Sequence, residues 1–402
     1  MPIRFVDHTN AHIDRLVEIA WGSQASHKGE YIRIPERRET EITQLINDEV
    51  ASAPEEEVSP IDELNREKPL VDLSKFSRPR SLDEGKVPAK PTPKRLLIAV
   101  DTGVVNLGEF IGGGIAFAVR GTAVCLMEDQ IIVLKYNTGA LLIDGQNKIP
   151  VFRYMGHRLG NEELYLTRNE DGNLVPRPSA FETGNQIRDR CRNFVERMIQ
   201  EEALGVLSAN QKGLLLIDGA LPAGTFDTPV SYIRDMLESA ANNKIDIAAV
   251  SKKSSIIVIE KPINAFFDDQ PTFIGYAPLK EVLTEERKQY AEQGIIREAT
   301  AITLASELFA VRFGLGPPAL TFRVDVHNSI RSTSSEVLND VFDQCQIQGC
   351  YPKPLIEAHQ FSSFLFQDVQ TLTSDLVVRT GARPKEDSSM EWMFSPFGSF
   401  GK

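Results

Sequence analysis

Two aspartates stand directly after apolar segments whose composition predicts buried β-strands. Asp101 follows residues 96–100 and Asp218 follows residues 214–217, and a glycine comes within two residues of each aspartate. Such runs are typical of strands covered on both faces of a sheet, and ligands bind in the crevice beyond the carboxyl ends of these strands. Because hard divalent cations prefer oxygen ligands, the two carboxylates predict half of a two-metal site.

A third carboxylate is expected on the helix predicted at residues 184–207. The candidates in this segment are Glu196, Glu201 and Glu202. Glu196 shares one helix face with the apolar residues Ile199, Ala203 and Leu207. An apolar face would pack on the sheet and turn Glu196 toward the strand ends. A competing apolar stripe contains Glu202 and runs through Ile187, Cys191, Val195 and Met198. Helical phase therefore favours Glu196 and leaves the other two glutamates open.

A second group of residues able to do chemistry lies at 349–359, with the sequence Gly-Cys-Tyr-Pro-Lys-Pro-Leu-Ile-Glu-Ala-His. Pro352 and Pro354 restrict the backbone, and a helix is expected to begin near Leu355 with His359 on its second turn. Tyr351 would then lie across the bend from His359. A tyrosine and a histidine held together can orient a water molecule or a phosphate.

Three other chemistries fit these residues less well. Asp101-Thr102-Gly103 matches the loop of aspartic proteases, but the loop at Asp218 lacks the hydroxyl residue and the pattern is not all-β. A sugar-kinase or actin-like phosphate site needs paired glycine-rich loops, and the glycines at 112–114 are more simply a turn. The spacing of Cys345, Cys350 and His359 matches no closed zinc site.

The rest of the chain predicts an α/β domain that would position these side chains. Strand patterns occur at 95–101, 113–126, 130–136, 214–218, 246–250, 255–260 and 319–326. Helical patterns occur at 184–207, 230–243, 280–292, 299–312 and 334–346. Strands that cluster early and then alternate with helices indicate a mixed β-sheet flanked by helices.

Composition excludes few functions. The 402-residue chain is 42% hydrophobic and 25% charged, which is ordinary for a globular protein, and its net charge of −12 argues against binding nucleic acid by its whole surface. A local basic groove is compatible with that total. The four cysteines form no disulfide framework, the first residues lack a signal peptide, and no apolar run approaches the ~20 residues of a membrane span. We therefore expect a reduced, cytoplasmic protein with no membrane partner.

The two ends of the chain differ from the predicted domain at 95–382. Residues 1–50 form an expected helical segment, with an apolar stripe at Ile13, Leu16, Val17 and Ala20 beside Trp21. Residues 51–94 are proline-rich and predict a linker or extended arm. Residues 383–402 form a tail that is rich in aromatic residues near its end. The apolar helix and the aromatic tail predict surfaces for a partner.

Five short segments follow one another in a fixed order: Ala99–Gly103, Leu216–Leu221, Ala248–Lys252, Phe322–Asp325 and Tyr351–His359. In that order they resemble the NurA nuclease family, over about residues 95–382. The chain departs from the family at two points. Thr102 stands where a Gly-Ser pair is commoner, and Cys350 lies between Gly349 and Tyr351.

The resemblance implies an RNase H-like fold and cleavage of DNA from 5′ ends that depends on Mn²⁺ or Mg²⁺. It also implies a homodimer that encloses DNA and docks onto a hexameric, HerA-type ATP-driven translocase. By position, the family's two metal-binding aspartates match Asp101 and Asp218, and its C-terminal motif matches Tyr351 and His359. Glu196 is the provisional third metal ligand and catalytic carboxylate. Lys252 matches a lysine after the third strand that would face a phosphate.

These expectations favour a metal-dependent DNA nuclease that processes DNA ends as a 5′–3′ exonuclease or endonuclease. The alternative is a catalytically inactive NurA-like adaptor that holds DNA for a translocase. Intact carboxylates at Asp101 and Asp218 favour the enzyme, because two like charges at adjacent strand ends repel each other and have no evident use without catalysis.

Overall fold

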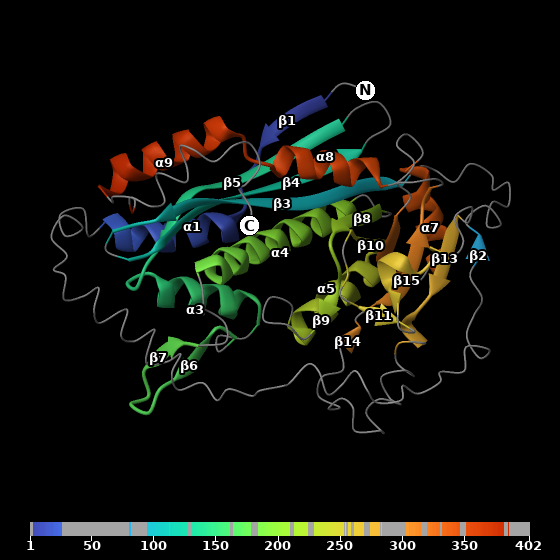
Figure 1. Cartoon of the computed structure of the whole chain (residues 1–402), viewed down its shortest axis with the longest axis horizontal. Coiled ribbons are helices and arrows are strands. Elements are labelled where there is room, and N and C mark those ends of the chain that lie inside the picture. The colour runs from blue at the N-terminus through green and yellow to red at the C-terminus, as the bar shows by residue number, and fades with distance from the viewer. Residues whose placement is uncertain are drawn as a thin grey trace.

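A large mixed β-sheet forms the middle layer of the protein, with helices on both of its faces (Figure 1). The structure is a computed structural model. It describes residues 3–25, 80–81, 95–111, 113–126, 131–160, 164–177, 184–209, 213–223, 229–252, 254, 256–258, 261–268, 274–281, 283, 303–304, 306–314, 320–329, 332–345, 351–381 and 385.

The described sheet has ten strands in the order β1-β5-β4-β3-β8-β10-β16-β15-β13-β2. Their bounds in chain order are β1 Ile3–Asp7, β2 Arg80–Ser81, β3 Leu96–Glu109, β4 Ile115–Leu126, β5 Ile131–Ile143, β8 Gly213–Asp218, β10 Ile245–Ser251, β13 Gly275–Pro278, β15 Glu307–Arg312 and β16 Thr321–His327. Strands β3, β8 and β10 are parallel, whereas β4 runs antiparallel to both β3 and β5. Short pairs join β6 (Leu166–Arg168) to β7 (Leu174–Pro176), β9 (Pro222–Ala223) to β14 (Thr303–Leu304), and β11 (Ile257–Val258) to β12 (Lys261–Pro262).

Helices cover both faces of the sheet. One face packs against α1 (Ala11–Ala25), α3 (Lys148–Arg158), α4 (Gly184–Ala209) and α5 (Val230–Asn242). The other face packs against α7 (Ser334–Asp343), α8 (Lys353–Ser362) and α9 (Phe366–Thr380), and Figure 1 shows α8 and α9 on the side opposite α4. A single 3₁₀ turn is described at η4 (Ile263–Ala265). In the described part of the chain, no helix has the length and hydropathy needed to cross a bilayer.

The site forms where β8 ends beside the middle of β3, so the predicted strand end at Asp101 is wrong. These strands pair in parallel from Leu96 opposite Gly213 to Val100 opposite Ile217. Strand β8 ends at the next residue, Asp218, while β3 continues to Glu109 beside β4. Because side chains alternate along a strand, Asp101 faces the α8 side and Thr102 faces the α4 side. Side chains of α8 and of α4 can therefore both reach the part of β3 that continues past the end of β8.

The predicted fold class is confirmed: the chain is α/β, with a mixed β-sheet flanked by helices. The predicted helix at 299–312 is wrong, because β15 and β14 lie there. Strand β15 pairs with both β13 and β16, and Leu308 and Phe309 pack in different core clusters on its two sides. A continuous apolar run of this kind has no strand alternation, and periodicity cannot separate it from a buried helix. Residues 284–292 of the helix predicted at 280–292 lie outside the described residues.

The N-terminal residues belong to the same sheet and core. Strand β1 pairs in parallel with β5, from Ile3 opposite Ile131 to Asp7 opposite Lys135. In α1, Ile13, Leu16 and Ala20 are buried in the core cluster that also holds α3 and α4. The expectation that this apolar stripe is free for a partner is therefore wrong. Most of the proline-rich segment and the aromatic tail at 390–400 lie outside the described residues.

Candidate metal centre

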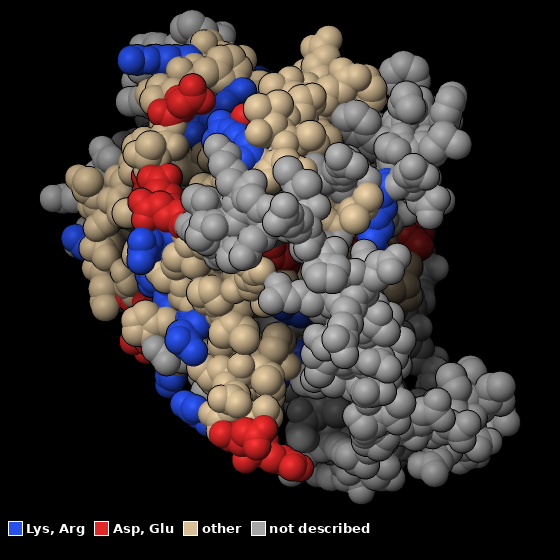
Figure 2. All heavy atoms as spheres, turned by 90° about the vertical axis from the view of Figure 1, so that its left-hand side faces the viewer, with Lys and Arg blue, Asp and Glu red and all other residues tan. Residues whose placement is uncertain are grey.

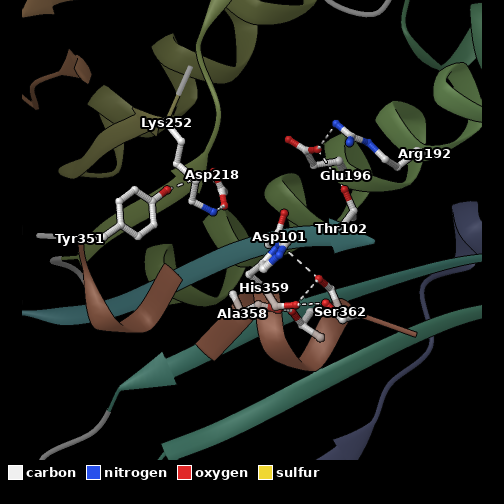
Figure 3. Close-up of polar contacts among 12 residues, drawn as sticks. Asp101, Thr102, Arg192, Glu196, Asp218, Lys252, Tyr351, Ala358, His359 and Ser362 are labelled. Carbon is white, nitrogen blue, oxygen red and sulfur yellow. Dashed lines mark hydrogen bonds and ion pairs between the residues drawn. The ribbon is translucent and has the colours of Figure 1, made fainter. Parts of the chain in front are cut away.

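Most of the functional side chains predicted from the sequence converge where β8 ends beside the middle of β3 (Figure 3). Asp101 comes from β3, Asp218 ends β8, and His359 comes from the last turn of α8. One ligand atom from each of these three residues lies within 4.8 Å of the other two. Strands and a helix that are far apart in the sequence thus bring two carboxylates and an imidazole together.

Local sequence explains how α8 presents His359. The helix begins directly after Pro352, and Pro354 lies in the first turn, where a missing N–H breaks no helical hydrogen bond. On the sheet side, the Thr122 hydroxyl of β4 donates to the Ala358 carbonyl at 2.7 Å. This bond is buried and fixes the residue immediately before His359 against the sheet.

Asp101 is nearly buried and accepts two hydrogen bonds on one oxygen. His359 Nδ1 lies 2.9 Å from Asp101 Oδ2, and the Ser362 hydroxyl donates to the same oxygen at 3.1 Å. The Asp101 residue is 8% exposed, whereas the His359 side chain is 60% exposed. An ionised carboxylate only accepts hydrogen bonds, so the contact requires the proton on Nδ1. In neutral His359, Nε2 is then the nitrogen with a free lone pair.

Asp218 is held by a phenol and an ammonium group. The Tyr351 hydroxyl donates to Asp218 Oδ1 at 3.0 Å and is also 3.2 Å from the Val250 carbonyl. Lys252 Nζ lies 2.6 Å from Asp218 Oδ2 and 4.7 Å from the centre of the Tyr351 ring. Tyr351 therefore contacts Asp218 while His359 contacts Asp101, and these contacts differ from the predicted contact between Tyr351 and His359 across the bend.

Burial fixes the protonation state of Tyr351. Burial raises the pKa of its phenol far above the ordinary value, and the negative charges of Asp218 and Asp101 raise it further. Tyr351 therefore remains protonated and donates to Asp218 across the working pH range. It can orient this carboxylate, but it cannot remove a proton from water.

Glu196 reaches the site from the opposite face of the sheet through Thr102. The Thr102 hydroxyl donates to Glu196 Oε2 at 2.9 Å, and Gln200 Nε2 donates to Oε1 at 3.0 Å. Arg192 and Arg197 each lie 3.7 Å from this carboxylate. Glu196 is 5% exposed and contacts Thr102, the neighbour of Asp101 in β3, but it is not in the group of close ligand atoms formed by Asp101, Asp218 and His359.

The other two glutamates of α4 have partners elsewhere. Glu201 is paired with Arg158 of α3. Glu202 is paired with His8 and accepts a hydrogen bond from Asn10 Nδ2 at 2.6 Å. Both therefore fasten α4 to neighbouring segments. Among the three glutamates, Glu196 is the one that contacts the strand carrying Asp101.

The close group of donor atoms fits a divalent cation. Carboxylate oxygens suit Mg²⁺ and Mn²⁺, and a histidine nitrogen is a common ligand of transition metals. Asp101 Oδ1 takes part in neither hydrogen bond of that carboxylate, and the Lys252 ammonium already supplies a positive charge to Asp218. Lys252 and His359 thus contact the two neighbouring carboxylates, and a bound cation would further offset the repulsion between them. The described cysteines, Cys125, Cys191 and Cys345, are buried and form no disulfide with one another, and Cys350 lies outside the described residues.

Charge on the outer surface is mixed on the side shown in Figure 2. Basic and acidic side chains are interspersed with other residues on the described part of this face, which includes the ends of α1, α3 and α9. The described part of this face therefore has no continuous basic patch, and the net charge of −12 argues against binding of nucleic acid by the whole surface.

Two residues of the site were not predicted as such from the sequence. Ser362 lies on the same face of α8 as His359, three positions later, and this helical spacing could have marked it. Thr102 was visible only as a departure from the family pattern. Its partner Glu196 lies on a distant helix, so no local signal links the two residues.

Comparison with solved structures finds members of the family that the sequence resembles. The NurA nuclease from Sulfolobus solfataricus is 10% identical, with 87% of this chain and 98% of that chain covered and a TM-score of 0.44. A NurA structure with manganese is 11% identical, with 85% and 98% covered and a TM-score of 0.32. A NurA structure bound to dAMP and manganese is 13% identical, with 89% and 100% covered and a TM-score of 0.33.

No protein-family model matches the chain, and no curated protein matches it. Identities and TM-scores in the range of these solved structures carry no inference about activity.

Proposed function

We propose that the protein is a divalent-metal-dependent DNA nuclease that hydrolyses phosphodiester bonds during DNA end processing. The observation that carries the proposal is the convergence of Asp101, Asp218 and His359, whose ligand atoms lie within 4.8 Å of one another. The ordered sequence segments that resemble the NurA family supply the substrate class. Two Mn²⁺ or Mg²⁺ ions would be held by Asp101, Asp218 and Glu196, and would supply Lewis acidity at the scissile phosphate.

The side chains around the aspartates have separate tasks in this proposal. His359 keeps Nδ1 against Asp101, so Nε2 accepts a proton from the attacking water. Tyr351 remains a hydrogen-bond donor and fixes the orientation of Asp218. Lys252 neutralises Asp218 in the free protein and is 42% exposed at its side chain, which lets its ammonium group turn to a substrate phosphate.

Glu196 is the third carboxylate of the proposal. Its contact with Thr102, the residue next to Asp101, supports this choice, while Glu201 and Glu202 are paired with other segments. Separate glutamine variants at the three positions test this assignment. Loss of cleavage in Glu196→Gln alone supports it, and normal cleavage by Glu196→Gln contradicts it.

The proposed partners are DNA, a second copy of the chain and a HerA-type hexameric translocase, in the cytoplasm. Because the apolar stripe of α1 is buried, the aromatic tail is the remaining terminal segment proposed for docking. Deletion of residues 388–402 should weaken co-elution with the hexamer and leave metal-dependent cleavage intact. Loss of the dimer or aggregation after this deletion would contradict docking through the tail.

Purified protein incubated with DNA labelled at either the 5′ or the 3′ end tests the activity directly. With Mn²⁺ we expect release of short products from 5′ ends, stimulation by the translocase, and no cleavage after EDTA is added in excess. Binding of DNA without cleavage under every metal condition would support the alternative, a catalytically inactive adaptor that holds DNA for the translocase.

A further inference from the structure

We infer that Ser362 is a positioning residue that orients the Asp101 carboxylate toward a bound cation. This role rests on the proposed function and adds a residue to its site. Ser362 is the last residue of α8 and is fully buried. Figure 3 shows its side chain beneath Asp101, next to His359 on the same helix.

Both donors from α8 meet one oxygen of Asp101. The Ser362 hydroxyl lies 3.1 Å from Oδ2, and His359 Nδ1 lies 2.9 Å from the same atom. A carboxylate with two donors on one oxygen is restrained in rotation, and the other oxygen, Oδ1, is left available. His359 is largely exposed, whereas Ser362 is enclosed, so the serine is the donor that solvent cannot replace.

The hydroxyl proton of Ser362 is directed to Asp101. Its oxygen is also 3.1 Å from the His359 carbonyl, a second acceptor within the helix. That carbonyl has another donor, since Ser363 Oγ lies 2.8 Å from it. A hydroxyl has one proton, and a charged carboxylate accepts a stronger hydrogen bond than a neutral carbonyl. The bond to Asp101 is therefore the favoured one.

Gly103 allows the helix end to come this close to β3. A Cβ atom at position 103 would lie 2.3 Å from the Ser362 carbonyl oxygen and 3.0 Å from its carbonyl carbon. Both are backbone atoms, which no change of side-chain rotamer can move. Any side chain at position 103 would therefore push the end of α8 away from Asp101. Gly103, two residues after Asp101 in β3, thus lets the end of α8 bring Ser362 close to Asp101.

Loss of the Ser362 hydroxyl should weaken cation binding before any reaction occurs. Groups that hydrogen-bond to a metal ligand typically change metal affinity by about 10–100-fold when removed. We therefore expect Ser362→Ala to weaken Mn²⁺ binding by about 10-fold or more. In the cleavage assay at saturating Mn²⁺, kcat should fall, while KM for DNA stays unchanged because Ser362 is buried and touches no substrate.

The test is a calorimetric titration of the DNA-free full-length protein with Mn²⁺. Ser362→Ala is compared with Ser362→Cys, which nearly keeps the volume but has a weak donor, and with Ser363→Ala as the matched control. Ser363 directly follows α8, is exposed and contacts the His359 carbonyl, but not Asp101. Thermal unfolding of each variant separates lost affinity from lost fold, and Ser362→Cys remains informative if the alanine variant is destabilised.

The inference is supported if Ser362→Ala and Ser362→Cys both lose affinity and Ser363→Ala does not. It is overturned if either folded Ser362 variant binds Mn²⁺ within twofold of the wild type, or if Ser363→Ala loses as much. Wild-type protein that binds no Mn²⁺ would overturn the proposed function together with this role. Wild-type binding with an unaffected Ser362→Ala would overturn the role of Ser362 alone.

Discussion

Replacement of Thr102 by valine removes the hydroxyl that holds Glu196 while keeping the shape and the strand preference of the side chain. Both residues are 5% exposed, and the bond to Oε2 measures 2.9 Å. A hydrogen bond to a charged group contributes about 1.5–3 kcal/mol to stability. Gln200 continues to donate to Oε1, and Arg192 remains 3.7 Å from Oε2. We therefore expect a loss near the lower end, about 1.5–2 kcal/mol.

The assay is equilibrium unfolding in urea, with Thr122→Val as the matched control. Thr122 is also a buried strand threonine, but its hydroxyl donates to a neutral carbonyl, that of Ala358, at 2.7 Å. An ordinary bond of this kind contributes about 0.5–1.5 kcal/mol. A double-mutant cycle with Glu196→Gln should show coupling between positions 102 and 196. The reasoning is refuted if Thr102→Val destabilises no more than Thr122→Val, or if the cycle shows no coupling.

Three further predictions concern buried groups outside this pair. Asp325→Ala should lower the free energy of unfolding by about 3–5 kcal/mol, because it leaves the buried Arg323 without the carboxylate that accepts two of its hydrogen bonds. A loss below about 1 kcal/mol, measured by unfolding in urea, would contradict this. Burial lowers the pKa of His327, so the unfolded chain binds a proton first as the pH falls. Stability should therefore drop below pH ~6.5, and the drop between pH 7.5 and 5.5 should shrink in His327→Gln, as measured by thermal unfolding; an equal drop would exclude this histidine as a cause. Tyr351→Phe keeps the buried ring but leaves Asp218 Oδ1 without its donor, and Mn²⁺ affinity measured by calorimetry should fall by about 10-fold; unchanged affinity would show that the phenol does not orient the carboxylate.

The two aspartates could be predicted as neighbours because the signal is local. The apolar runs before Asp101 and Asp218 specify buried strands, and parallel pairing brings the aspartates together, although β3 continues past Asp101 to Glu109. The prolines around Tyr351 likewise define where α8 starts. The preference for Glu196 came from helical phase alone, and its contact with Thr102 follows from how α4 packs across the sheet.

Other features depend on contacts that a single sequence does not reveal. Strand β15 reads as a helix because both of its faces are covered, which removes the alternation that marks a strand. Strand β1 is mostly exposed at the sheet edge, and its pairing with β5 is a long-range event without a local signal. Ser362 carries no chemistry of its own, and its importance arises from its distance to Asp101.

In the proposed nuclease, Asp101 and Asp218 together hold the metal that cleaves DNA. The most direct test measures Mn²⁺-dependent cleavage of end-labelled DNA by wild type, Asp101→Asn and Asp218→Asn, with Asp375→Asn as the control. Asp375 is a partly exposed aspartate of α9, far along the chain from the site aspartates, whose partner is Arg379. We expect both site variants to fall below about one hundredth of the wild-type rate while they remain folded and bind DNA, because a lost ligand should cost at least as much as a lost ligand-orienting group. Wild-type cleavage by folded Asp101→Asn or Asp218→Asn would contradict the account and place the chemistry elsewhere.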